Sequence, residues 1–226
     1  MKIETTNFTK VIGKVNVLDN INVSLESGNI YGVVGRNGSG KTMLLRMVAG
    51  LILPTNGEVR IDGKVLGKDI SFPDKLGILL EKPSFLGHLT GYANLQMLAK
   101  IRNVTKNEDI QYYMNMLGLD WENDKKFKKY SLGMKQKLGI IQAIMENQQI
   151  IILDEPFNAL DETSVGTLRE VLEKLRAEQK LIVMTSHNKE DIQLLCDHTF
   201  TISDGKIIST HKNIKHENDL ITARDA

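Results

Sequence analysis

The stretch that decides the fold is Gly35-Arg36-Asn37-Gly38-Ser39-Gly40-Lys41-Thr42. It fits the pattern G-x-x-x-x-G-K-[ST] of a phosphate-binding loop. The apolar residues 30–34 before it predict a buried strand, and residues 43–49 after it predict a helix that ends at Gly50. Glycines let backbone N–H groups turn toward phosphate oxygens, and the helix start adds its positive dipole end. The stretch therefore predicts a nucleotide site.

The loop offers one group for each part of a bound triphosphate. The Lys41 ammonium should reach the β- and γ-phosphates, and the Thr42 hydroxyl should ligate Mg²⁺. A glycine-rich turn without a ligand is the competing interpretation, but a turn does not require a Lys-Thr pair at this fixed offset. The remaining residues expected to bind the nucleotide are Asn37, Gly38, Ser39 and Gly40.

Composition excludes several classes of protein. The 226 residues are 41% hydrophobic and 25% charged, which is ordinary for a globular protein, and the net charge of +1 gives no sign of nucleic-acid binding. The single cysteine, Cys196, excludes an internal disulfide framework. No apolar run approaches the ~20 residues that a membrane-spanning helix needs. A second chain would have to supply any membrane span.

Hydrophobic periodicity predicts an α/β fold. Strand-like runs before the loop and at 57–63 suggest a flanking antiparallel sheet, and the pattern turns helical from about residue 90 to residue 148. Residues 199–202 and 206–208 predict two edge strands joined by an Asp204-Gly205 turn. We expect a single domain over 1–226. Its parts are a core lobe (about 1–84 and 149–210), a helical lobe (about 85–148) and a polar tail (about 211–226).

A pair of carboxylates follows the apolar run 149–153. That run predicts a strand buried on both faces of a parallel sheet, so Asp154 should lie at the carboxyl edge, where it can hold Mg²⁺. Glu155 could polarise the attacking water as a general base. His187 follows the predicted strand 181–185 at the same edge, within reach of the γ-phosphate or the water. Solvated strand ends are the alternative, but the phosphate loop requires a metal carboxylate.

The chain resembles ABC-type ATPases at three further stretches. Their signature loop is similar to Tyr130-Ser131-Leu132-Gly133-Met134-Lys135-Gln136, their D-loop to Asn158-Ala159-Leu160-Asp161, and their switch histidine to His187. All motifs stand in the family's order between about Lys2 and Ile208. The resemblance implies a phosphate-loop (RecA-like) core, a flanking antiparallel β-subdomain and an inserted α-helical subdomain. It also implies hydrolysis of ATP with Mg²⁺.

The resemblance implies a head-to-tail homodimer in the ATP-bound state. Each ATP would lie between the phosphate loop of one subunit and the signature loop of the other. Ser131 and Gly133 carry over as contacts to the γ-phosphate. The physical chemistry agrees, because a hydroxyl and an unhindered N–H group at a predicted helix start form an anion site.

Three places depart from the common family pattern. The signature loop reads Ser131-Leu132-Gly133-Met134 where the family usually has Ser-Gly-Gly-Gln, so only Ser131 and Gly133 carry over as γ-phosphate contacts. Glu81 stands where the family usually has the Q-loop glutamine, and a carboxylate there can ligate Mg²⁺ but cannot donate a hydrogen bond. We therefore expect Glu81 to join Thr42 and Asp154 as a metal ligand. Ile12 stands where the family stacks an aromatic ring on adenine, so Ile12 and Val17 are expected to give the base only apolar contact.

A narrower similarity suggests the biological role. The stretches 81–85 and 89–95 resemble the ATPase subunits of bacitracin- and lantibiotic-resistance exporters. This implies a cytoplasmic subunit, peripheral on the inner face of the cell membrane, that powers a separate transmembrane permease. The cargo would be a peptide antibiotic or a similar toxic amphiphile. Phe85 and Tyr92, expected to be exposed, would form part of the permease docking surface.

Two other functions compete with the exporter interpretation. One is a soluble ABC-type ATPase that acts on nucleic acid or ribosomes. Such proteins usually carry paired ATPase domains, long coiled coils or basic extensions, whereas this chain has a single expected domain and no sustained heptads. The other is a regulator that binds ATP without turnover, and the presence of both Glu155 and His187 argues against it.

Overall fold

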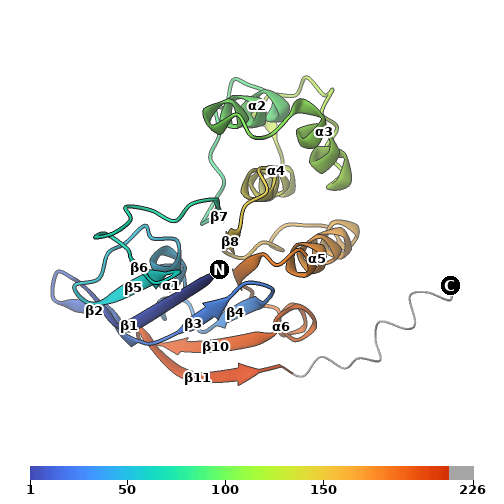
Figure 1. The fold of residues 1–226 in the computed structure, drawn as a ribbon. Helices are drawn as coiled ribbons and strands as arrows, with labels where there is room; N and C mark the ends of the chain where they lie inside the picture. Colours follow the sequence, from blue (N-terminus) through green and yellow to red (C-terminus); the bar gives the residue numbers. More distant parts are fainter. Residues whose placement is uncertain (214–226) are drawn as a thin grey trace.

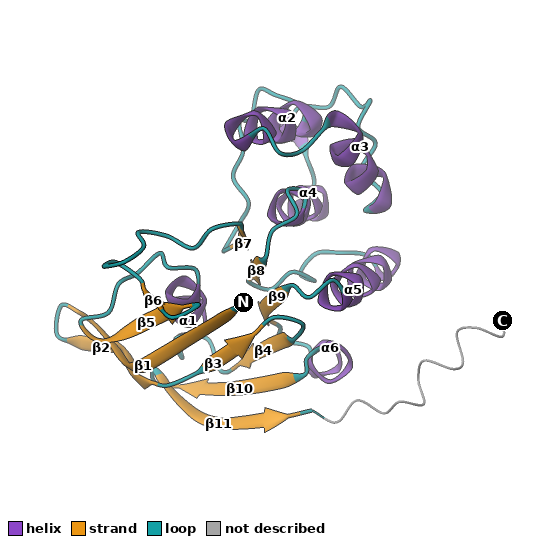
Figure 2. Cartoon of the chain, viewed as in Figure 1, coloured by secondary structure: helices purple, strands orange, loops and turns teal. Residues whose placement is uncertain are grey.

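The computed structural model describes residues 1–213 and contains two sheets (Figures 1 and 2). In chain order the strands are β1 (Lys2–Ile12), β2 (Val15–Ile21), β3 (Ser24–Glu26), β4 (Ile30–Val34), β5 (Asn56–Ile61), β6 (Lys64–Val65), β7 (Leu76–Leu79), β8 (Ile150–Leu153), β9 (Leu181–Thr185), β10 (His198–Ser203) and β11 (Lys206–Lys212). The helices are α1 (Lys41–Val48), α2 (Gly91–Arg102), α3 (Asn107–Met116), the 3₁₀ helix η1 (Phe127–Lys129), α4 (Leu132–Ile144), α5 (Glu162–Ala177) and α6 (Lys189–Leu195).

The larger sheet places the phosphate loop beside the predicted catalytic strands. Its order is β11-β10-β4-β9-β8-β7, and every neighbouring pair is parallel except β10 with β11. The smaller sheet, β2-β1-β5-β6 with β3 also on β1, is antiparallel. The predicted α/β class with a flanking antiparallel sheet is therefore confirmed. The carboxyl ends of β4, β9 and β8 meet at one edge, where parallel sheets bind ligands.

Alternate side chains of the parallel strands enter two separate apolar clusters. On β8, Ile150 and Ile152 pack in a cluster with α1 and the antiparallel sheet, whereas Ile151 and Leu153 pack with the helices on the other face. All four side chains are fully buried, which is why this run is apolar without alternation. The helices α2, α3 and α4 lie together beyond the ends of β7 and β8, on one side of the molecule (Figures 1 and 2).

Strand pairing corrects two expectations about the C-terminal hairpin. β10 pairs with both β4 and β11, so of the two hairpin strands only β11 lies at an edge of the sheet. β11 continues through His211 and Lys212, past the predicted start of the polar tail. The Asn213 side chain donates hydrogen bonds to the Cys196 carbonyl (2.9 Å) and the Thr199 hydroxyl (3.0 Å). Residues 214–226 of the predicted tail lie outside the described residues.

The expectation that Phe85 and Tyr92 are exposed is wrong. Both side chains are half-buried against the helical cluster. The Phe85 ring meets the Phe127 ring edge-on at 5.1 Å between centroids, and the Tyr92 ring lies 5.5 Å from that of Trp121. Aromatic pairs of this geometry stabilise a core. These two rings therefore pack against the helices, although other side chains of the segment after β7, such as Leu86, are exposed.

The packing of β7 on α4 predicts the result of a glycine substitution. A Cβ atom at Gly77 would lie 1.8 Å from the Ala143 carbonyl oxygen, so Gly77→Ala must push the helix and strand apart. We expect a loss of about 1–3 kcal/mol in the free energy of unfolding, as for other overpacked cores. Thermal melting of the purified variant measures it. Gly166→Ala is the control, because a Cβ there meets nothing within 4 Å on an exposed face of α5. That variant should melt at or above the wild-type temperature, and a wild-type melting temperature for Gly77→Ala would contradict the packing argument.

Candidate nucleotide-binding and hydrolysis site

The phosphate loop joins the end of β4 to the start of α1. Gly40 precedes the helix with φ +110°, a conformation that favours glycine. Gly35 is needed for close approach, because a Cβ there would lie 2.3 Å from the Ile202 carbonyl oxygen. The loop therefore keeps its backbone N–H groups at the N-terminus of α1, which is an anion site.

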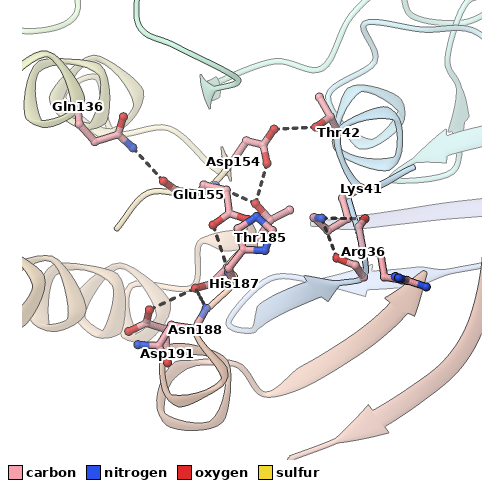
Figure 3. A network of polar contacts seen from close by, with 12 residues as sticks. Arg36, Lys41, Thr42, Gln136, Asp154, Glu155, Thr185, His187, Asn188 and Asp191 are labelled. Atoms are coloured by element: carbon pink, nitrogen blue, oxygen red, sulfur yellow. Dashed lines mark hydrogen bonds and ion pairs between the residues drawn. The ribbon is translucent and has the colours of Figure 1, made fainter. Parts of the chain in front are cut away.

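Lys41 lies across this loop. Its side chain is buried, and Nζ donates hydrogen bonds to the carbonyl oxygens of Gly35 (2.8 Å) and Arg36 (3.2 Å) (Figure 3). The ammonium is therefore held over the loop that should receive phosphate oxygens. A cation at this position attracts the phosphate groups of a nucleotide that binds at the loop.

A hydrogen-bonded bridge through Asp154 joins three elements at the sheet edge. The Thr42 hydroxyl donates to Asp154 Oδ2 at 2.9 Å, and the Thr185 hydroxyl donates to Oδ1 at 2.7 Å (Figure 3). Thr42 lies on α1, Thr185 ends β9, and Asp154 follows β8. The carboxylate is thus fixed beside the loop, as predicted. No local pattern marks Thr185 as a site residue, although it stands two positions before His187.

Glu155 and His187 face each other at the same edge. His187 Nε2 lies 3.0 Å from Glu155 Oε1, and the His187 backbone N–H group donates to Oε2 at 3.2 Å (Figure 3). Burial raises the pKa of the Glu155 carboxyl above its ordinary value, and the nearby His187 ring opposes that shift. Oε1 is buried and, among the described residues, has no hydrogen bond of good geometry.

These groups line one cleft of about 380 Å³. Its lining consists of Asn37, Gly38, Gly40, Lys41, Thr42, Met43, Asp154, Glu155 and His187. The predicted phosphate-loop residues therefore line the same cleft as Asp154, Glu155 and His187, with one exception. Ser39 is buried, and its hydroxyl has no hydrogen-bond partner among the described residues.

Glu81 lies apart from this cleft lining. Its carboxylate forms an ion pair with Arg46 on α1, at 2.6 Å between Oε1 and Nη2. Arg46 was not identified from the sequence, because nothing in its local pattern marks it as a partner. Of the three predicted metal ligands, only Thr42 and Asp154 are in contact with each other. Two hard oxygen donors suit Mg²⁺, which is usually bound by one or two carboxylates plus phosphates and water.

The remaining predicted residues lie outside the cleft lining. Ser131 caps α4, and its hydroxyl accepts a hydrogen bond from the Met134 N–H group at 3.2 Å. Gly133 lies so close to the Ala159 carbonyl that a Cβ would be 2.6 Å from its oxygen. Ile12 ends β1 and is 53% exposed. Val17 is half-buried, with its carbonyl beside Gly40.

Comparisons with known proteins agree with this geometry. A family model described as "ABC transporter" matches residues 18–158. The uncharacterized ABC transporter ATP-binding protein YybJ of Bacillus subtilis (strain 168) is 45% identical over 212 residues, which cover 94% of this chain and 97% of that protein. The chain belongs to the ABC transporter family. It is an ATP-binding subunit that couples ATP hydrolysis to transport.

Two relatives named for antibiotic transport and one solved structure are also similar to this chain. The bacitracin transport ATP-binding protein BcrA of Enterococcus faecalis is 40% identical over 91% of this chain and 68% of its own length. The lantibiotic transport ATP-binding protein SrtF of Streptococcus pyogenes is 32% identical over 89% and 87%. The dimeric structure of the bacterial ABC transporter cassette MJ0796 superposes with a TM-score of 0.84 at 24% identity, covering 95% of this chain and 100% of that one. The ABC cassette fold expected from the signature motifs is confirmed.

The site geometry predicts distinct effects for two substitutions. Glu155→Gln should still bind ATP but hydrolyse it more slowly by on the order of 10²-fold or more, because an amide cannot take a proton from water. Lys41→Ala should lower ATP affinity instead, because it removes the buried cation of the loop. Steady-state ATPase rates and ATP binding by titration separate the two effects. A Glu155→Gln protein with the wild-type rate would contradict the assignment.

Proposed function

We propose that this ATPase powers the export of a peptide antibiotic or a similar toxic amphiphile. The observation that supports export is the similarity to BcrA and SrtF, which are named for bacitracin and lantibiotic transport. No helix in the described part of the chain is long and apolar enough to cross a membrane. The proposal therefore includes a separate transmembrane permease, which holds this subunit at the inner face of the cell membrane.

Within the site, each residue has a proposed role. Lys41 and the loop N–H groups bind the β- and γ-phosphates, and Glu155 takes a proton from the attacking water. His187 orients that water or the γ-phosphate, since it lies 3.0 Å from the Glu155 carboxylate. Thr42 and Asp154 hold Mg²⁺, and Glu81 is a third ligand if it leaves Arg46. The ion, when bound, neutralises phosphate charge.

We also propose that a second copy completes the site. Ser131 is exposed at the start of α4 and does not line the cleft of its own chain. A hydroxyl and an unhindered N–H group at a helix start can bind an anion, so Ser131 and Gly133 of one copy suit the γ-phosphate held by another. For the base, Ile12 and Val17 supply apolar contact without an aromatic ring. The ATP-bound form is therefore proposed to be a two-fold homodimer.

A tagged full-length chain in its native cell tests the exporter proposal. It should co-purify from detergent-solubilised membranes with a protein that has several membrane spans. Deleting the gene should sensitise the cell to bacitracin or a lantibiotic. Glu155→Gln serves as the matched variant, because it should keep the membrane complex and lose resistance. Recovery of the chain with ribosomes and without a membrane protein would overturn the proposal.

A further inference from the structure

The side chain of Gln136 connects α4 to the backbone at Glu155. Gln136 lies in the second turn of α4 and is 7% exposed. Its Nε2 group donates to the carbonyl oxygen of Glu155 at 3.0 Å (Figure 3). It also donates to the carbonyl oxygen of Pro156 at 3.2 Å. Both contacts are to main-chain atoms, so they fix the path of the chain that leaves β8.

The backbone at Glu155 needs such support. Its φ is +50°, in the left-handed region that a residue with a side chain rarely adopts. Conformations of this kind persist when the surroundings hold them. The Glu155 N–H group donates to the Thr185 hydroxyl at 2.8 Å, and its carbonyl accepts from Gln136. A side chain at the end of β9 therefore holds the N–H group of Glu155, and a side chain of α4 holds its carbonyl oxygen.

We propose that Gln136 is a positioning residue for Glu155. By holding the Glu155 and Pro156 carbonyls, it keeps the left-handed backbone that aims the carboxylate at His187 and the cleft. The same helix begins with Ser131 and Gly133, so the placement of the signature loop and that of the carboxylate depend on one element. This inference rests on the general-base role proposed for Glu155.

Contacts other than those of the Gln136 amide also anchor α4. Toward its other end the helix packs on β7, where Gly77 fits under the Ala143 carbonyl. Gly139 fits against Pro83 and Leu79 in the same region. Removing the amide should therefore leave the helix in place and release only the backbone at Glu155.

Substitution by methionine tests the proposal in the full-length chain. Gln136→Met keeps the shape of the side chain and removes both donors. We expect kcat to fall by about tenfold or more, because small misplacements of a catalytic group are costly, while ATP affinity changes by less than about twofold. Gln142→Met, on the same helix and half-buried, is the matched control and should keep the wild-type kcat. Should Gln136→Met melt below the assay temperature, Gln136→Leu also lacks the donors and should show the same loss.

A double substitution separates positioning from a general structural effect. If Gln136 acts through Glu155, adding Gln136→Met to Glu155→Gln should lower the residual rate no further. ATP-dependent dimerisation of Glu155→Gln should also be unchanged by the addition. A kcat for Gln136→Met within about twofold of wild type would overturn the proposal. So would a double variant in which Gln136→Met lowers the rate of Glu155→Gln by the same factor as it lowers the wild-type rate. A fully active Glu155→Gln protein would instead refute the general-base role itself, so the two failures are distinguishable.

Discussion

The hydrogen-bonded bridge through the Asp154 carboxylate is the constraint on which the site depends. It joins a hydroxyl on α1, the end of β8 and a hydroxyl at the end of β9, with both carboxylate oxygens engaged. Hydrogen bonds to a charged group contribute about 1.5–3 kcal/mol each, so the bridge fixes orientation without dominating the stability of the fold. The phosphate loop and the catalytic edge are thereby held in one geometry.

The strand order makes this bridge possible. β9 lies between β4, which leads into the loop, and β8, which leads to Asp154. Because all three strands are parallel, their carboxyl ends open onto one cleft. Glu155 lies just after β8 and His187 just after β9, and His187 Nε2 is 3.0 Å from Glu155 Oε1. The contact between Glu155 and His187 is thus a consequence of sheet topology, and Gln136 adds a contact from the helical side.

The sequence predicts best what is encoded locally. The phosphate loop has a fixed spacing, and Asp154 and His187 follow runs so apolar that only buried strands explain them. Contacts between distant elements were missed, since no local pattern marks the pairing of Arg46 with Glu81 or of Gln136 with the Glu155 carbonyl. The prediction that β10 is an edge strand is wrong because its parallel partner, β4, lies far away in the sequence, and no local pattern indicates that pairing. The prediction that Phe85 is exposed is wrong for a similar reason, because the ring that packs on it, Phe127, stands 42 residues further along the chain.

The central claim is that this cleft is half of an ATP site that a second copy completes. Light scattering on the Glu155→Gln chain tests it most directly, because bound ATP persists when hydrolysis is blocked. The chain should have its monomer mass of 25.4 kDa without nucleotide and about twice that mass with saturating ATP and Mg²⁺. Adding Ser131→Arg should abolish the shift by placing a bulky side chain at the proposed contact. A chain that binds ATP and Mg²⁺ and keeps the monomer mass would contradict the account.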